Sequence, residues 1–260
     1  MKQRMSSEFV YQLFALLLAV IVVHAIYVGL IRPSADAQIQ QQMELQASGE
    51  DFVPERTLAV VIRDFEQEAC FILLIWALAI MGYKGLRTMR EQELLQRRLL
   101  DIPEGTSVLP EDAREYSRSL EALPEQEQDF LLPRTLLSAL QRFATTGSIQ
   151  AVSDTIKESC EVESDRLDSE LSMVRYIAWA IPSIGFIGTV RGIGDALGQA
   201  YKAVEGDISG VTVSLGVAFN STFVALVLSL VIMFCLHQLQ LSQERLVLDC
   251  QRSSDKRLLR

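Results

Sequence analysis

Two threonines, Thr189 and Thr222, are the residues of this sequence best placed for chemistry inside a membrane. Thr189 stands about 12 Å along a helix from Leu197, and Thr222 about 16 Å from Val211, where two apolar runs end. Hydroxyl groups at similar depth on two neighbouring helices could line a narrow polar path for an ion, and Ser229 on the same stripe as Thr222 would extend that path. Alternatively, each hydroxyl donates to the carbonyl four residues earlier in its own helix.

Small residues share one helix face with Thr189. Gly185, Gly188 and Gly192 follow one another at i, i+3 and i+7, so they line a single face. Glycines let membrane helices approach closely, although no hydrophobic drive brings such helices together. Pro182 on this face lacks an N–H, which frees the carbonyl of the residue four positions earlier and allows a kink. A simpler interpretation is a tight helix–helix interface without any ion path.

Charged and amide residues near the threonines indicate further roles. Arg191 and Asp195 are four residues apart near the outer end of their run, where an ion pair would lower the cost of the charges. Asn220 points away from Thr222 on its helix, which predicts a contact between subunits. No Asp or Glu lies near the middle of an apolar run, so a proton carrier would need a carboxylate from another chain.

Four apolar segments must position these residues, and we expect all four to be transmembrane helices. Apolar residues make up 49% of the 260 residues and charged residues 22%, and the two kinds are segregated along the chain. About 20 helical residues span the hydrocarbon core of a bilayer. Strand signals are essentially absent, so the predicted fold is all-α and polytopic. The N-terminus with the first span covers residues 1–31, and the other spans are 69–83, 176–197 and 211–236.

Basic residues predict the orientation, because they concentrate on the cytoplasmic side of membrane proteins. They place both termini, the helical region 84–175 and the tail 237–260 in the cytoplasm. The acidic loop 32–68 and the short loop 198–210 then face the other side. Region 84–175 is too polar for a large core of its own, its charges are expected to be solvated, and its last helix is predicted to continue into the third span.

A second interpretation of the N-terminus is a signal peptide. Residues 33–37 (PSADA) follow a basic start and an apolar run, as a cleavage site would. Cleavage would leave three spans and a new N-terminus outside. The apolar run is much longer than that of an ordinary signal peptide, which favours a retained helix.

Composition argues against several functional classes. With 24 basic and 33 acidic residues, the net charge of −9 does not favour nucleic-acid binding through bulk charge. Four cysteines without a CxxC motif and only two histidines do not predict a metal site. No nucleophile–base arrangement or phosphate-binding loop is visible, so we expect neither an enzyme nor a cofactor, and the partners expected include membrane lipid but no nucleic acid.

Residues 181–192 (IPSIGFIGTVRG), paired with 215–230 (LGVAFNSTFVALVLSL), resemble the last two membrane helices of the MotA/TolQ/ExbB proton-channel family. The resemblance implies a five-subunit ring in the bacterial inner membrane. The ring would enclose two copies of a single-span partner of MotB/TolR/ExbD type, whose intramembrane Asp carries the proton. By motif position, Thr189 and Thr222 look like the pore-facing threonine pair, and Pro182 like the proline at the kink.

The resemblance leaves the subfamily open. Val217 stands where TolQ and ExbB types carry a Glu, and four spans look more like MotA, whereas loop 32–68 is longer than in flagellar MotA types. The predicted function is an ion-channel subunit, or motor stator, driven by the proton-motive force, with H⁺ or Na⁺ as the transported ion. Two alternatives are a non-conducting membrane scaffold and a sensor whose loop 32–68 binds a ligand. The downstream process and the charges that transmit force stay open.

Overall fold

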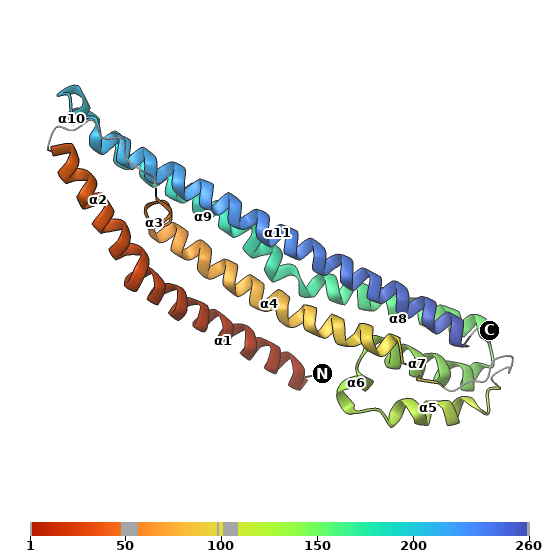
Figure 1. Ribbon diagram of the computed structural model, residues 1–260. Helices are drawn as coiled ribbons and strands as arrows, with labels where there is room; N and C mark the ends of the chain where they lie inside the picture. The colour runs from red at the N-terminus through yellow and green to blue at the C-terminus, as the bar shows by residue number, and fades with distance from the viewer. Residues whose placement is uncertain (1, 48–56, 98, 101–108, 259–260) are drawn as a thin grey trace. The chain divides into compact units, whose positions relative to one another are not determined.

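The computed structural model describes residues 2–47, 57–97, 99–100 and 109–258. Within these ranges all regular secondary structure is helical and no strand occurs, which confirms the all-α fold. The helices, labelled in Figure 1, are α1 Lys2–Ile26, the π-helical η1 Tyr27–Ile31, α2 Arg32–Ala47, α3 Leu58–Val61, α4 Phe65–Leu95, α5 Ala113–Glu121, α6 Glu125–Gln128, α7 Leu131–Thr146, α8 Ile149–Glu170, α9 Ser172–Gly198, α10 Ala200–Val204 and α11 Ser209–Leu258.

Four helical stretches are long and apolar enough to cross a membrane, as predicted. They are Glu8–Gln42, Phe65–Leu95, Ile149–Gly198 and Ser209–Leu258. Their lengths of 31 to 50 residues exceed the roughly 20 residues that a bilayer requires. The protein is therefore membrane-embedded, and its membrane helices continue beyond the apolar segments from which they were predicted.

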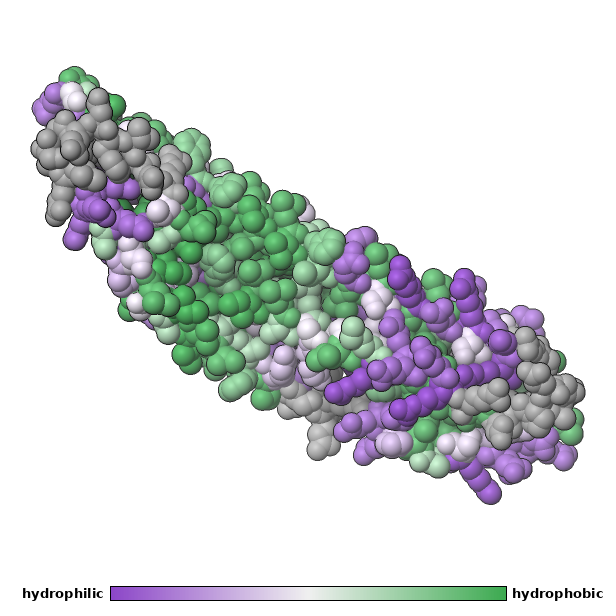
Figure 2. Space-filling view, in the orientation of Figure 1, coloured by the Kyte–Doolittle hydropathy of each residue, from purple (hydrophilic) through white to green (hydrophobic). Residues whose placement is uncertain are grey.

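The chain divides into two compact units. We call residues 1–81 and 173–236 the membrane unit, and residues 82–172 and 237–260 the polar unit. Large apolar side chains are exposed on the membrane unit, and its face in Figure 2 is largely hydrophobic. Such a surface suits contact with lipid or with other membrane helices.

In the membrane unit, α4 packs on α1 and on the pair formed by α9 and α11 (Figure 1). The indole N–H of Trp76 in α4 donates to the carbonyl of Gln12 in α1 at 3.0 Å. The Cys70 thiol of α4 lies 3.7 Å from the carbonyl oxygen of Ile181 in α9 and donates to it. α4 thus connects the first membrane helix to the two helices that carry the threonines.

The predicted loop 32–68 is wrong over its first half. α1 continues through η1 into α2, so the chain is helical as far as Ala47. Pro33 lacks an N–H and disfavours a regular α-turn before it, and the wider π-helical turn of η1 stands directly before this position. Polar composition misled the prediction, because hydropathy indicates burial and not backbone conformation. The possible cleavage site 33–37 lies within α2, and residues 48–56 of the predicted loop lie outside the described residues.

The last two membrane helices follow the prediction more closely. α8 and α9 are separated by Leu171 alone, so the predicted continuous helix is present with one interruption. The predicted spans 176–197 and 211–236 lie within α9 and α11. The predicted tail 237–260 continues α11 as helix to Leu258, where the described residues end.

The polar unit has a hydrophobic core, contrary to the expectation for residues 84–175. The end of α11 supplies the apolar side chains that residues 84–175 lack. Its Val247 and Cys250 are buried against helices α5, α7 and α8. Gly147, with φ of 60°, ends α7, and the Ser148 side chain caps α8 by accepting the N–H of Ala151. Two distant segments therefore build one core, with Leu120, Leu131, Leu136, Leu140 and Cys160 among its buried residues.

Candidate functional site

The two threonines lie against each other across the interface between α9 and α11. Their Oγ1 atoms form a hydrogen bond. Thr189 also lies 3.1 Å from the carbonyl oxygen of Ala218, and Thr222 lies 3.2 Å from that of Gly185. Each hydroxyl thus reaches a carbonyl on the facing helix, whereas the contact of Thr189 with the Gly185 carbonyl in its own helix is longer, at 3.4 Å.

This threonine cluster contains more acceptors than donors. Each of its two carbonyls already accepts a backbone N–H within its own helix, and the two hydroxyls supply only two protons for the three contacts among the four oxygens. Such a cluster favours an additional hydrogen-bond donor or a cation. The geometry is therefore compatible with an ion path, beyond the mutual packing of two helices.

Glycines bring α9 and α11 close enough for these contacts. A Cβ atom on Gly188 would lie 2.5 Å from the Cβ of Ser221, and one on Gly192 would lie 2.8 Å from the Cβ of Ala218. Gly185 is packed as tightly, and all three glycines are buried. The face predicted from their spacing is thus the face that contacts α11, and a side chain on it would push the helices apart.

Pro182 and Ser229 are linked through one backbone carbonyl. Because Pro182 has no N–H, the carbonyl of Ala178 lacks its usual partner in α9. The Ser229 hydroxyl of α11 donates to this carbonyl at 3.1 Å. The sequence predicted that Ser229 lies on the ion path. In the structure its hydroxyl proton is donated to a backbone carbonyl of α9, and Ser229 lies about two helical turns from Thr222.

The principal partner of Arg191 is Glu66, at the start of α4. Nε and Nη2 of Arg191 lie 2.7 and 2.9 Å from the two carboxylate oxygens of Glu66. The predicted pair with Asp195 is looser, at 3.8 Å. A signal for Glu66 was present in the sequence as an acidic residue just before the second apolar run, but 125 positions separate it from Arg191.

Glu66 is a carboxylate of this chain near the threonine cluster, but it lies at the start of α4 and not near the middle of a span, so the expected proton-carrying carboxylate from another chain stays a prediction. The Glu66 side chain is 12% exposed, and its Cγ lies 3.3 Å from the position of a Cβ on Gly188, the neighbour of Thr189. Both carboxylate oxygens are bound by Arg191, so Glu66 is a paired charge and not a free proton carrier.

The buried carboxylate of Glu68 in α4 binds the first membrane helix. One oxygen lies 2.7 Å from Nδ1 of His24, and the other accepts a hydrogen bond from Arg32. The Arg32 guanidinium also lies 4.3 Å from the centre of the Phe65 ring, within the range of a cation–π contact. These contacts fix the start of α4 against α1 and α2.

Asp64, directly before α4, is a third acidic side chain in this region. Burial raises the pKa of its carboxyl above the ordinary value, and the charges of Arg63 and Arg191 act in the opposite direction. The Arg63 guanidinium lies 4.0 Å away. Burial is the larger influence, so the folded protein holds the proton of Asp64 more tightly than water does.

Asn220, the predicted subunit contact, is half-buried on α11. Its neighbours Phe219 and Phe223 are exposed on the same helix. The contact of Asn220 with a second subunit stays a prediction.

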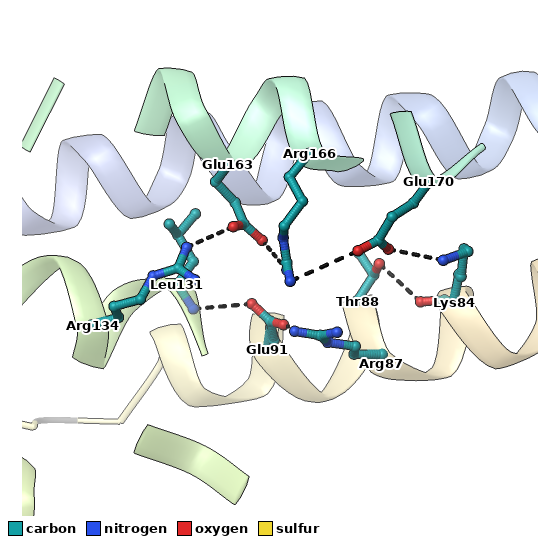
Figure 3. Close-up of polar contacts among 9 residues, drawn as sticks. All are labelled: Lys84, Arg87, Thr88, Glu91, Leu131, Arg134, Glu163, Arg166 and Glu170. Carbon is teal, nitrogen blue, oxygen red and sulfur yellow. Dashed lines mark hydrogen bonds and ion pairs between the residues drawn. The ribbon is translucent and has the colours of Figure 1, made fainter. Parts of the chain in front are cut away.

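A cluster of charged side chains lies inside the polar unit, as Figure 3 shows. Glu163 of α8 is 2% exposed and binds two arginines, Arg134 of α7 at 2.6 Å and Arg166 of its own helix. Lys84 of α4 lies 2.8 Å from a carboxylate oxygen of Glu170. The expectation that charges of this region are solvated is therefore wrong for this cluster, which ties α4, α7 and α8 together.

Glu91 of α4 belongs to the same cluster and caps another helix. Its carboxylate accepts the backbone N–H of Leu131, the first residue of α7, at 3.1 Å (Figure 3). The side chain of Phe130, which precedes α7, supplies no capping hydrogen bond. Glu91 therefore caps the N-terminus of α7, a role that a residue directly before the helix usually has. Among the residues that the structure describes, no three His, Cys, Asp or Glu side chains lie close enough to hold a metal ion.

Comparison with known families finds a match, in the second half of the chain. The model of the MotA/TolQ/ExbB proton channel family matches residues 127–252. Over these residues, slightly less than half of the chain, the protein is similar to that family. The MotA/TolQ/ExbB match runs from α6 to near the end of α11, so it contains Thr189, Thr222 and the glycine face, whereas Glu66 and the rest of α4 lie before it.

The match to the MotA/TolQ/ExbB family over residues 127–252 supports a membrane proton-channel role. The four apolar helices are compatible with a MotA-like topology, and the subfamily is not assigned. No curated protein matches the chain.

Proposed function

We propose that this protein is a channel subunit of a motor or energy-transducing complex that the proton-motive force drives in the bacterial inner membrane. Its subunits form a ring of five around a single-span partner of MotB/TolR/ExbD type, which carries an intramembrane Asp. Both termini and the polar unit face the cytoplasm in this proposal, consistent with the distribution of basic residues. The protein acts without enzymatic turnover or a cofactor, and the transported ion is its cargo.

The observation that carries the proposal is the acceptor-rich contact between Thr189 and Thr222. A partner Asp that has taken up a proton is neutral, so it can face a dry helix surface at low cost. The carboxylic acid proton can then be donated to the hydroxyl and carbonyl oxygens at the threonine level. Loss of the proton on the inner side would restore the charge and return the partner to a hydrated position.

Proton flux into proteoliposomes that contain the purified complex of this chain and its partner tests the proposal. Replacing both threonines in Thr189→Val with Thr222→Val keeps the side-chain shape but removes both hydroxyls, and should abolish flux. Thr212→Val is a matched control, because Thr212 lies on α11 and donates to the Ile208 carbonyl of its own helix at 3.0 Å. Flux at the wild-type rate in the double variant would contradict the proposal. Replacing H⁺ gradients by Na⁺ gradients identifies the ion.

A non-conducting scaffold is the second candidate, because the glycine face and the cross-helix hydrogen bonds also hold α9 against α11. A scaffold needs the close packing of α9 and α11, but it does not need hydrogen-bond acceptors that face a path. It predicts that the wild-type complex forms and conducts no ions, and that the double valine variant assembles with the same partner and supports the same cellular process.

A further inference from the structure

Gln67 of α4 is a buried polar residue whose hydrogen bonding is incomplete. Its side chain is 0% exposed. The side-chain N–H₂ group donates to the Val61 carbonyl at 3.1 Å and lies 3.4 Å from Oγ of Ser221 in α11. The amide oxygen Oε1 is equally buried and accepts no hydrogen bond from any residue that the structure describes. A buried acceptor without a donor is costly, so it calls for an explanation.

The neighbouring groups fix the orientation of this amide. The Val61 carbonyl is an acceptor only, so the nitrogen of Gln67 must face it and the amide cannot be reversed. The Ser221 hydroxyl gives its single proton to the Val217 carbonyl at 3.0 Å, and therefore has none for Gln67. Exchanging the positions of N and O in the side-chain amide would therefore not give the oxygen a hydrogen-bond donor.

Gln67 lies beside the threonine cluster. Ser221, which Gln67 contacts, precedes Thr222 and packs directly on Gly188, the residue before Thr189. α4 therefore brings an amide oxygen to the same level of the membrane unit at which α9 and α11 bring hydroxyl and carbonyl oxygens. The family match does not include this part of α4.

We propose that Gln67 and Ser221 hold a water molecule that extends the polar path from the threonine cluster to α4. Complete burial of Gln67 restricts the ligand to something the size of water, and an amide oxygen requires a hydrogen-bond donor. A buried water needs two to four polar partners, and Gln67 Oε1 and the second lone pair of Ser221 Oγ provide two. The placement of this water on an ion path rests on the proposed function, whereas its binding to Gln67 does not.

Two measurements on the intact complex test the site. The first is a cryo-EM or crystal structure of the complex with its partner, at a resolution that shows ordered waters. Density at hydrogen-bonding distance from both Gln67 Oε1 and Ser221 Oγ is expected. If a protein donor occupies that position, or if both side chains are clear and no density lies between them, the site does not exist.

The second measurement is proton flux in proteoliposomes. Gln67→Leu removes the amide oxygen at similar volume and should lower flux about tenfold, as expected for the loss of one hydrogen bond on the path. Ser221→Ala removes only one oxygen atom and should lower flux several-fold. This variant tests the site if the Gln67→Leu protein does not assemble. Cys70→Ala is the control, because Cys70 is buried one turn further along α4 and carries no oxygen.

The two proposals can fail separately. Wild-type flux in an assembled Gln67→Leu or Ser221→Ala variant would overturn the placement of the water on the path. Absence of flux from the wild-type complex would overturn the proposed function, and the density at Gln67 would still decide whether the water is bound.

Discussion

Ser229 of α11 donates its hydroxyl proton to the carbonyl oxygen of Ala178 in α9, at 3.1 Å. This carbonyl is the one that Pro182 leaves without its helical partner, and Ala178 is buried. A proline inside a membrane helix is tolerated when a neighbouring helix satisfies the freed group. The third and fourth membrane helices are therefore joined at two levels, by Ser229 and by the threonine cluster.

Replacing Ser229 by alanine should destabilise the membrane unit in a way that depends on Pro182. Ser229→Ala leaves the Ala178 carbonyl buried without a donor, which costs about 1–3 kcal/mol. Pro182→Ala restores an N–H for the same carbonyl, so Ser229→Ala should cost much less in the Pro182→Ala background. Thermal unfolding in detergent of the wild type, the two single variants and the double variant measures this coupling. Equal losses in both backgrounds would show that the two residues act independently.

Gly188→Ala should prevent the normal approach of α9 and α11. The new Cβ would lie 2.5 Å from the Cβ of Ser221, so the helices must separate, at a cost of about 1–3 kcal/mol. Gly194→Ala on the same helix is the matched control, because nothing lies within 4 Å of its added Cβ. Thermal stability and subunit assembly should fall for the first variant only. Comparable behaviour of both alanine variants would mean that close packing at Gly188 is not required.

Glu163→Gln should destabilise the polar unit by about 1–3 kcal/mol, because it takes the buried carboxylate away from two arginines, whose own side chains are 42% and 36% exposed. Glu161→Gln on the same helix is the control. The Glu161 side chain is 68% exposed, and its contact with Lys157 is 3.9 Å long, so we expect an effect below about 0.5 kcal/mol. Hydrogen exchange of α7 and α8 in the full-length protein measures both. Unchanged protection in Glu163→Gln would indicate that the cluster does not hold these helices together.

Asp64 predicts a stability that depends on pH. Its pKa is raised by burial, so the folded state holds the proton more tightly than the unfolded state does. Folding should gain stability as the pH falls through the raised pKa, and lose it as the pH rises. Asp64→Asn should remove this dependence and stabilise the protein at neutral pH. Thermal unfolding from about pH 4 to pH 8 checks the sign, and an Asp64→Asn protein that is less stable at pH 7 and equally pH-dependent would contradict it.

The sequence by itself determined the elements and two of the helix faces. Long apolar runs predict membrane helices because their length must match the bilayer, and the spacing of Gly185, Gly188 and Gly192 predicts a common face because the helical period is local. The same period and the apolar run lengths placed Thr189 and Thr222 at similar depth. These inferences required no knowledge of which helix packs on which.

Tertiary structure alone decided which polar groups meet. Arg191 prefers Glu66, 125 positions away, to Asp195, its neighbour on the same helix, and Gln67 contacts Ser221 across 154 positions. Glu163 looks like a surface residue in the sequence and is buried, because the end of α11 completes the core around α7 and α8. Local periodicity tells which side of a helix is apolar. Ion pairing and burial depend on the distances between helices, which are set only when the whole chain packs.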